Sequence, residues 1–494
     1  MESKIYVSDV ITTDVIKKLE KGKNYIIGSE MNSGKNYWMR YVLLPYASKN
    51  NERTLFLSHR RNTLDQQADY LEEYKWEQLR NFRGGMFDVK SYQAFQNMIK
   101  RDDPIIHSYD YIVCDEAHYF VSDSSFNTKT ELAFDFLNEN TKAIKIFMTG
   151  TSDGLYYLPW INKLEVLHEA NYYNNQVKDM YRYEQNETVS AVINNEVEKG
   201  NKVLVYHNSK DTMCDFEIGN SKVLHSGNRE NSLEFKQIAE TRHFECDVLN
   251  TTKLMTEATE IKDDSVETIV IHGISDIDTF VQATGRVRTQ KVNVYYKRVS
   301  KKSIQAKLRY LKKQLYYFDE FKKLGEIEFV KEYGLDVIDK SMKAFYLTTV
   351  IDPISNQEYP RLKVHNTGLA YLCYQAEIYA FMDEYGFEAF FEKYFPNIHY
   401  FDLEQLKREE LVQLDIVDNY IGKKIFKEQQ QELKDVICKK YGLRGKNGST
   451  KVGIKTINAF FEKNNIPFII ESEKDNVRSS ETYGKRYWEL KEID

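Results

Sequence analysis

A glycine-containing segment near the N-terminus constrains the fold of this 494-residue chain more than any other feature. The segment Gly28–Asn36 reads GSEMNSGKN and lies between the apolar run Asn24–Gly28 and a stretch typical of a helix. Glycines in such a turn let backbone N–H groups surround phosphate oxygens, the helix N-terminus adds partial positive charge, and Lys35 reaches the outer phosphates. We therefore predict a phosphate-binding loop, although an ordinary strand-to-helix turn is the alternative. The predicted phosphate-binding residues are Gly28, Asn32, Ser33, Gly34, Lys35 and Asn36.

Short apolar runs alternate with longer amphipathic stretches from residue 24 to about residue 300, which is typical of βαβ units on a parallel sheet. Two such blocks are visible. The first has apolar runs at 24–28, 54–57, 111–114 and 144–148, and the second at 202–206, 223–224, 246–249, 267–271 and 292–295. The connection 153–185 is rich in Tyr and Asn without a clear period, so we expect few strands in it.

The C-terminal part of the chain has a different character. Apolar residues at helical spacing predict a helix over 303–324, and the sequence up to about residue 431 looks mostly helical. An amphipathic stretch at 452–461 precedes strand-like runs at 467–470 and 486–490, which suggests a winged helix. A protein-docking or purely packing module is the alternative.

The length predicts three domains or slightly more, at about 150 residues each. We expect an α/β fold with two tandem parallel-sheet domains, followed by a helical region and a basic C-terminal module. The expected boundaries are 1–165, 166–300, 301–430 and 431–494.

Composition excludes several other classes of protein. The formal net charge of −6 argues against a protein that coats nucleic acid with its whole surface, but basic residues gather locally at 297–313 and 433–463. The five cysteines are far apart and predict neither a zinc site nor disulfides. No apolar run reaches the roughly 18 residues of a membrane span, and the N-terminus has no signal-peptide pattern. We therefore expect a cytoplasmic protein with no membrane partner.

Two adjacent carboxylates follow the apolar run 111–114. We expect Asp115 to hold Mg²⁺ and Glu116 to polarise the water that attacks the γ-phosphate of ATP. Asn36 stands where a phosphate-binding loop usually has Ser or Thr, so its amide oxygen is expected at the metal, either directly or through water. The alternative for the two carboxylates is a solvated turn.

These motifs, together with Thr149–Ser152 after another apolar run, resemble motifs I, II and III of superfamily 2 helicases of the DEAD/DEAH type. In the second block, Val203–His207 resembles motif IV, Gln282–Arg288 resembles motif VI, and Val248–Ile261 loosely matches motif V. The resemblance covers about residues 20–300. It implies two RecA-like domains that hydrolyse ATP between them and act on a nucleic-acid strand.

The resemblance also implies roles for residues of the second block. Gln282 and Arg286 are expected to act in hydrolysis with Glu116, and Arg286 is the expected arginine finger. The family has its second arginine where this chain has Thr289, so Arg288 is expected in that role. Glu260 replaces the usual Asp of motif V and is expected at the nucleotide.

Leu57–Arg61 and Lys90–Gln93 resemble motifs Ia and Ib, and their polar and basic groups suit a phosphodiester backbone. DNA, single-stranded or forked, is preferred over RNA because of the expected winged helix. The Ser-His-Arg sequence also resembles origin-binding replication helicases of viruses and phages. The predicted nucleic-acid contacts are Ser58, His59, Arg60, Ser91, Tyr92 and Thr252.

The sequence thus predicts an ATP-dependent helicase or translocase with a replication or loading protein as a further partner. One alternative is an ATP-dependent switch that clamps nucleic acid without unwinding it, which Asn36, Ala258 and Thr289 favour. The other is a catalytically silent scaffold that recognises an origin or a partner. Intact Lys35, Asp115 and Glu116 count against the scaffold.

Overall fold

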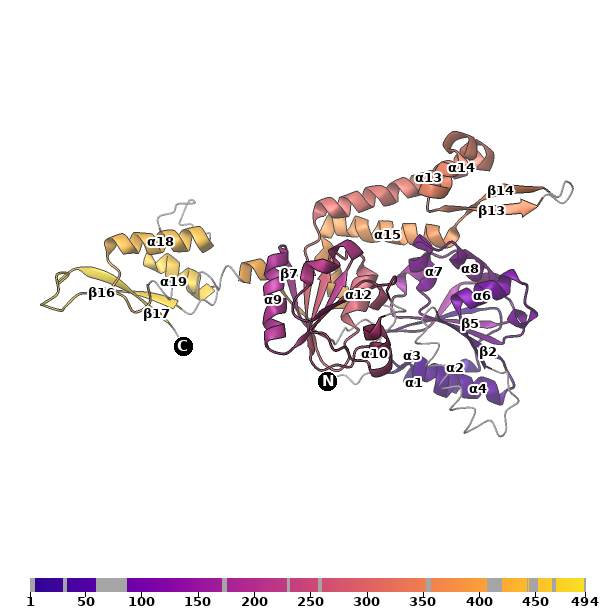
Figure 1. Cartoon of the computed structure of the whole chain (residues 1–494), viewed down its shortest axis with the longest axis horizontal. Coiled ribbons are helices and arrows are strands. Elements are labelled where there is room, and N and C mark those ends of the chain that lie inside the picture. Colours follow the sequence, from indigo (N-terminus) through magenta and orange to yellow (C-terminus); the bar gives the residue numbers. More distant parts are fainter. Residues whose placement is uncertain are drawn as a thin grey trace. The chain divides into compact units, whose positions relative to one another are not determined.

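A computed structural model describes the chain in segments (Figure 1). These are residues 5–29, 33–58, 87–170, 176–228, 232–255, 260–351, 357–406, 420–441, 443, 452–463 and 468–492. They form two compact units. Unit 1 comprises Met1–Met180 and Val189–His399, and unit 2 comprises Tyr181–Thr188 and Tyr400–Asp494.

The first lobe of unit 1 is built on a six-stranded sheet in the order β3-β2-β4-β5-β1-β6, and all its neighbouring strands run parallel. Its strands are β1 (Asn24–Gly28), β2 (Thr54–Ser58), β3 (Phe87–Ser91), β4 (Tyr111–Asp115), β5 (Ile144–Thr149) and β6 (Leu164–Glu169). Every residue of β1, β2, β4 and β5 is buried, as expected for strands covered on both faces. Successive side chains of these strands join two separate apolar clusters, one on each face.

Helices cover both faces of this sheet (Figure 1). One face carries α1 (Val7–Val10), α2 (Thr13–Ile16), α3 (Lys35–Trp38), a π-helical turn (Met39–Leu43) and α4 (Leu44–Lys49). The other carries α6 (Tyr92–Lys100), α7 (Tyr119–Ser122) and α8 (Lys129–Glu139).

The second lobe is built on a seven-stranded sheet in the order β15-β7-β12-β11-β8-β10-β9. Its strands are β7 (Val177–Tyr183), β8 (Lys202–His207), β9 (Ser221–Leu224), β10 (Val248–Thr251), β11 (Val266–His272), β12 (Val292–Lys297) and β15 (His399–Asp402). The end of β7, from Tyr181, and β15 from Tyr400 are counted in unit 2. From β12 to β9 the neighbours are parallel. Its helices are α9 (Asn186–Glu198), α10 (Leu233–Thr241) and α12 (Ile277–Thr284). The predicted pair of tandem RecA-like sheets is therefore confirmed.

The region after the second lobe contains the predicted long helix, α13 (Lys301–Tyr333), which departs from helical geometry at Gly325. It also contains α14 (Leu335–Ser341), α15 (Asn366–Tyr385) and α16 (Phe391–Tyr394). The predicted, mostly helical region is confirmed, and the structure adds an antiparallel hairpin of β13 (Phe345–Ile351) and β14 (Glu358–Val364) that was not expected.

The connection 153–185 also differs from expectation, because β6 and β7 lie in it. Only some of their residues are buried, so neither strand shows the continuous apolar run of a central strand. β6 crosses residue 165, where the sequence placed the end of the first domain. The predicted division into four domains otherwise stays a prediction.

Unit 2 contains α18 (Lys427–Tyr441), α19 (Ile454–Lys463) and the antiparallel hairpin of β16 (Phe468–Lys474) and β17 (Arg486–Glu492). Both helices pack on the hairpin through one buried apolar cluster, which includes Leu433, Ile457, Phe461 and Leu490. The predicted helix and hairpin are present, and the winged-helix assignment stays a prediction. Throughout the described segments, no helix has the length and apolar character that crossing a bilayer requires.

Candidate functional site

The predicted phosphate-binding loop leaves the carboxyl end of β1 and enters α3. Gly34 has a φ of +83°, a left-handed conformation that glycine adopts without strain, and it precedes the first residue of the helix. Ser33 is buried, and its hydroxyl lies 2.7 Å from that of Ser29. The Lys35 ammonium donates a hydrogen bond to the Ser29 carbonyl oxygen at 2.6 Å, so this cation lies over the loop. Asn32 falls outside the described residues.

Asn36 and Asp115 supply oxygen atoms suited to Mg²⁺. Asn36 Oδ1 is buried and accepts no hydrogen bond from any residue in the described segments. Asp115 is buried at the end of β4, which lies two strands from β1 in the sheet. Asp115 ends its strand and Asn36 follows the loop after β1, so both lie at the carboxyl edge, where α/β sheets bind ligands. The amide and carboxylate oxygens fit the predicted metal, because Mg²⁺ prefers hard oxygen ligands.

Glu116 directly follows β4 and has a φ of +50°, which is uncommon for a residue with a side chain. Its neighbour Ala117 donates a backbone hydrogen bond to the Met148 carbonyl oxygen of β5 at 2.9 Å. The adjacent strand thus holds this turn in place. Backbone strain of this kind is commonly found at functional sites.

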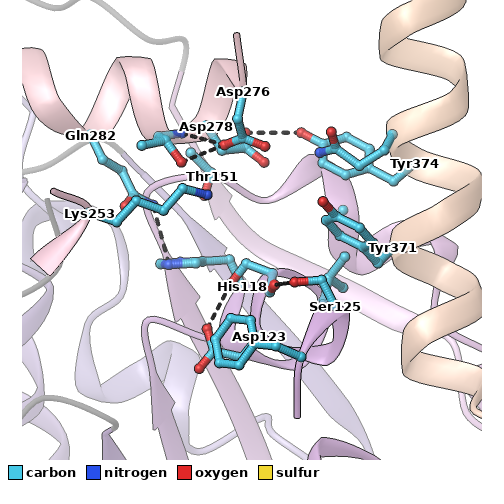
Figure 2. Close-up of a pocket in the computed structure, with 16 residues that line it drawn as sticks. His118, Asp123, Ser125, Thr151, Lys253, Asp276, Asp278, Gln282, Tyr371 and Tyr374 are labelled. Carbon is cyan, nitrogen blue, oxygen red and sulfur yellow. Dashed lines mark hydrogen bonds between the residues drawn. The ribbon is translucent and has the colours of Figure 1, made fainter. Parts of the chain in front are cut away.

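A series of hydrogen bonds links the two lobes through His118. Figure 2 shows its first member, between Gln282 and His118. The Gln282 amide nitrogen, on α12, lies 3.2 Å from His118 Nε2, and His118 Nδ1 lies 3.1 Å from Thr149 Oγ1. Because an amide nitrogen can only donate, His118 Nε2 accepts and Nδ1 carries the proton. Thr149 Oγ1 then donates to the Thr151 carbonyl oxygen at 3.1 Å. These hydrogen bonds join the stretches that resemble motifs II, III and VI.

Arg286 is buried after α12, and its Nε donates to the Gln282 carbonyl oxygen at 3.2 Å. Arg288 forms an ion pair with Glu260 within the second lobe. Backbone hydrogen bonds from Ile261 N to Arg286 O and from Arg288 N to Ile261 O align the two segments. The structure therefore pairs Arg288 and Glu260 with each other, and their predicted roles at the nucleotide stay predictions.

Among the predicted nucleic-acid contacts, Ser58 and Ser91 are register partners at the ends of β2 and β3, with Tyr92 next in the chain, whereas Thr252 lies in the second lobe. Tyr92 requires a correction, because it is fully buried, donates to the Asp115 carbonyl oxygen at 3.0 Å and stacks on Tyr119, so no ring surface is open to a base. Ser58 is buried at the end of β2, and the Ser91 hydroxyl accepts a hydrogen bond from Ala94 N as the cap of α6. Thr252 is half-buried after β10. His59 and Arg60 lie outside the described residues.

Glu169 is a residue of the site that sequence reasoning missed. It ends β6 and accepts a hydrogen bond from the Ser152 hydroxyl at 3.0 Å. A Cβ at Gly28 would lie 3.1 Å from the same hydroxyl, so Ser152 lies directly against the start of the phosphate-binding loop. The residue could not be found from sequence because the strand that positions it has no continuous apolar run.

A cavity of about 210 Å³ lies between the two lobes and α15 (Figure 2). The first lobe contributes His118 and Thr151, the second contributes residues of α12, and α15 contributes two tyrosines. The labelled lining residues include Asp123, Ser125, Lys253, Asp276, Asp278, Tyr371 and Tyr374. The helical region that the sequence left without a role is therefore part of this site.

Two carboxylates of this cavity have opposite pKa shifts. Burial, followed by the charges of Asp276 and Asp153, raises the pKa of Asp278 to about 8, and the Tyr374 hydroxyl donates to Asp278 Oδ1 at 3.0 Å. Burial alone would also raise the pKa of Asp276, but Lys253 and two hydrogen bonds from Thr279 outweigh it and lower this pKa.

Comparisons with known proteins agree with the motifs. Residues 6–153 match the family model described as the type III restriction enzyme, res subunit, and these residues contain both the phosphate-binding loop and Asp115–His118. Together with the two parallel sheets, this match confirms the resemblance to superfamily 2 helicases. The narrower likeness to origin-binding helicases stays a prediction. No curated protein sequence matches the chain closely enough to count as a relative.

Several solved helicase structures are similar to this chain. S. cerevisiae Dbp5 bound to RNA and ADP BeF3 is 16% identical, with a TM-score of 0.44 over 57% of this chain and 81% of Dbp5. The DEAD-box helicase Mss116 bound to ssRNA and UDP-BeF is 12% identical, with a TM-score of 0.46 over 58% of this chain and 68% of Mss116. Mycobacterium smegmatis helicase Lhr bound to ssDNA and AMP-PNP is 11% identical, with a TM-score of 0.42 over 57% of this chain and 45% of Lhr.

Proposed function

We propose that this protein is an ATP-dependent, Mg²⁺-requiring helicase or translocase that acts on nucleic acid, with DNA as the preferred polymer. The observation that carries the proposal is the contact between Gln282 and His118. It joins the lobe that contains the phosphate-binding loop to the lobe that contains the arginines resembling motif VI. Hydrolysis at this junction would open and close the lobes and move them along a strand.

The chain's own groups have separable roles in this proposal. Lys35 and the loop around Gly34 bind the phosphates, and Glu116 orients and polarises the attacking water. Arg286 supplies positive charge toward the γ-phosphate from the second lobe. Asp115 and Asn36 would hold Mg²⁺, which neutralises phosphate charge when it is bound.

The hydrogen-bond chain through His118 supports coupling between hydrolysis and lobe movement. If Gln282 moves with the second lobe, the hydrogen bond to His118 Nε2 breaks, and the residues that resemble motif III lose one restraint. We infer that the conformation of the segment Thr149–Ser152 depends on lobe closure through the hydrogen bonds of His118 and Thr149.

The first test is the rate of ATP hydrolysis with Mg²⁺, without polymer and with single-stranded DNA, forked DNA, duplex DNA or single-stranded RNA. Lys35→Ala should abolish ATP binding and turnover, because it removes the cation that lies over the loop. Glu116→Gln should abolish turnover while ATP still binds.

Glu139→Gln is the matched control, since Glu139 is an exposed carboxylate in the same lobe. Unchanged turnover in Lys35→Ala or Glu116→Gln would contradict the assignment. Stimulation of the ATPase rate by one polymer would identify the nucleic acid on which the protein acts. A strand-displacement assay would separate unwinding from translocation alone.

An ATP-dependent switch that clamps nucleic acid without unwinding is the second candidate. The pairing of Arg288 with Glu260 favours it, because the second arginine of the motif is then engaged within its own lobe. ATP-dependent binding without strand displacement would support this alternative. A replication or loading protein as a further partner belongs to the same proposal and would be sought by co-purification with the Glu116→Gln variant.

A further inference from the structure

The tip of the hairpin in unit 2 carries basic side chains without acidic partners. Figure 1 shows the hairpin of β16 and β17 projecting past α18 and α19. Four exposed basic residues lie at or beside its tip, and none of them forms an ion pair with another residue in the described segments. They are Lys474, Arg478, Lys485 and Arg486.

The strand part of the same hairpin is different. Its basic residue Lys491 lies 2.7 Å from Glu471, 3.6 Å from Glu473 and 3.4 Å from Glu489. Lys491 is therefore paired within the strands, whereas the four basic residues at the tip form no ion pair in the described segments and outnumber the exposed Glu481 among them. In a protein with a formal net charge of −6, this local excess of basic over acidic residues is suited to an anionic partner.

The turn that presents these residues is held rigidly by Asp475. This carboxylate is buried and accepts hydrogen bonds from the hydroxyls of Thr482 at 2.5 Å and Ser480 at 2.8 Å. Lys424 pairs with it at 3.0 Å, and these interactions hold the pKa of Asp475 well below its usual range. The negative charge of Asp475 is thus neutralised by partners within the turn. Because these partners already fix the turn, binding at the tip costs little conformational entropy.

We propose that this hairpin tip binds duplex DNA, with the basic residues on the phosphates and the tip at the major groove. A two-stranded β-ribbon fits the major groove of B-form DNA, while the major groove of A-form RNA is too deep and narrow. Tyr483 and Val477 are 54% and 52% exposed at the tip, where they can contact sugars and thymine methyl groups. The site goes beyond the proposed function, because it lies in unit 2 and requires no ATP.

The test measures binding of the full chain to a fluorescent duplex DNA without ATP, by anisotropy over a range of salt concentrations. The variant is the triple substitution Arg478→Ala, Lys485→Ala and Arg486→Ala. Its matched control is Lys423→Ala, Lys427→Ala and Lys491→Ala, which removes the same charge from exposed or partly exposed positions away from the tip. Single-stranded DNA and duplex RNA of the same sequence are the competing probes.

We expect the tip variant to bind duplex DNA about tenfold more weakly, or weaker still. We also expect the slope of log affinity against log salt to become shallower by about 0.9 for each phosphate that the variant no longer neutralises. The control variant should change the affinity for duplex DNA and the salt slope by less than the tip variant does. Equal losses of affinity in both variants, or no loss in either, would overturn the proposal, as would an equal loss for duplex RNA or single-stranded DNA.

Basal ATP hydrolysis of both variants is measured alongside. A chain that binds duplex DNA through the tip but does not hydrolyse ATP would refute the proposed function and leave this site standing. The single substitution Arg478→Gln gives a second reading with a smaller expected loss of affinity, and circular dichroism establishes that each variant is folded.

Discussion

At the scale of single residues, Asp276 and Asp278 show how neighbouring carboxylates acquire opposite properties. Asp276 caps α12, and Thr279 and Lys253 stabilise its charged form. Asp278 lies two residues later, where burial and the charge of Asp276 stabilise its neutral form. The same local fold therefore gains stability from ionising one carboxyl group and loses stability from ionising the other.

Asp278→Asn is expected to raise stability at pH 8 more than at pH 5. The folded-state pKa of about 8 lies above the ordinary value of 3.8, so the folded state holds the proton longer than the unfolded state. The contribution of Asp278 to the free energy of unfolding is fully present below about pH 4 and is lost as the pH rises to about 8. Asparagine removes that loss and still accepts the hydrogen bond from Tyr374. Urea unfolding midpoints at the two pH values measure the difference.

Asp276→Asn is the paired comparison, with the opposite sign. Because the pKa of Asp276 is lowered in the folded state, its ionised form contributes stability above the ordinary pKa of 3.8 for an aspartate. This contribution is lost as the pH falls through the folded-state pKa. Asparagine keeps a cap but loses the charge, so stability at pH 7 should fall. Stabilisation by both substitutions would contradict the assigned environments.

The residues of the site differ in how far the sequence could predict them. Lys35, Asp115 and Glu116 could be predicted because their chemistry is encoded in contiguous motifs next to strong apolar runs, and their roles stay predictions. Tyr92 was misplaced because exposure depends on tertiary packing, and here the ring packs on Tyr119. Glu169 was missed because its approach to Gly28 depends on strand pairing between β1 and β6.

At the scale of elements, α15 connects the helical region to both lobes. Its first turn is held by Glu131 of α8, which accepts hydrogen bonds from Asn366 Nδ2 at 2.6 Å and Thr367 N at 2.8 Å. Further along α15, Tyr374 donates to Asp278 of the second lobe. The helix thus restrains both lobes, and the cavity between them depends on its position.

Glu131→Ala should lower the free energy of unfolding by about 2 kcal/mol or more, because it removes two hydrogen bonds to a buried carboxylate and a stabilising anion at a helix N-terminus. Amide hydrogen exchange should also become faster in the first turns of α15. Glu139→Ala, at the exposed end of the same helix α8, is the control. An equal effect of the two substitutions on stability would contradict the role of Glu131.

The elements that the sequence predicted correctly are the central ones. Strands buried on both faces, such as β4 and β8, appear as continuous apolar runs. The hairpin of β13 and β14 was not predicted, since most of its residues are partly or fully exposed and neither strand has the continuous burial of a central strand. Exposed strands of small sheets thus depend on their pairing partner and on tertiary packing, which a local hydrophobic pattern does not encode.

At the scale of the whole molecule, ATP binding should raise thermal stability by mass action. An ATP analogue with Mg²⁺ at about 100 times its dissociation constant stabilises a protein by about 2.7 kcal/mol. Lys35→Ala should show no increase in melting temperature, whereas Arg286→Ala should keep a smaller increase because the loop in the first lobe still binds the phosphates. Differential scanning fluorimetry measures this, and an equal increase in Lys35→Ala would contradict the placement of the nucleotide.

The discontinuous make-up of unit 2 has a consequence for biosynthesis. Tyr181–Thr188 belongs to this unit, yet its partners come from the last part of the chain, as in the ion pair of Arg182 with Asp402 across 220 residues. At about 5 to 20 residues per second, the ribosome needs about 10 to 40 s to synthesise that interval. During that time the edge of β7 that later receives β15 has no partner strand. The nascent chain therefore exposes an open sheet edge, the kind of surface that chaperones shield from aggregation.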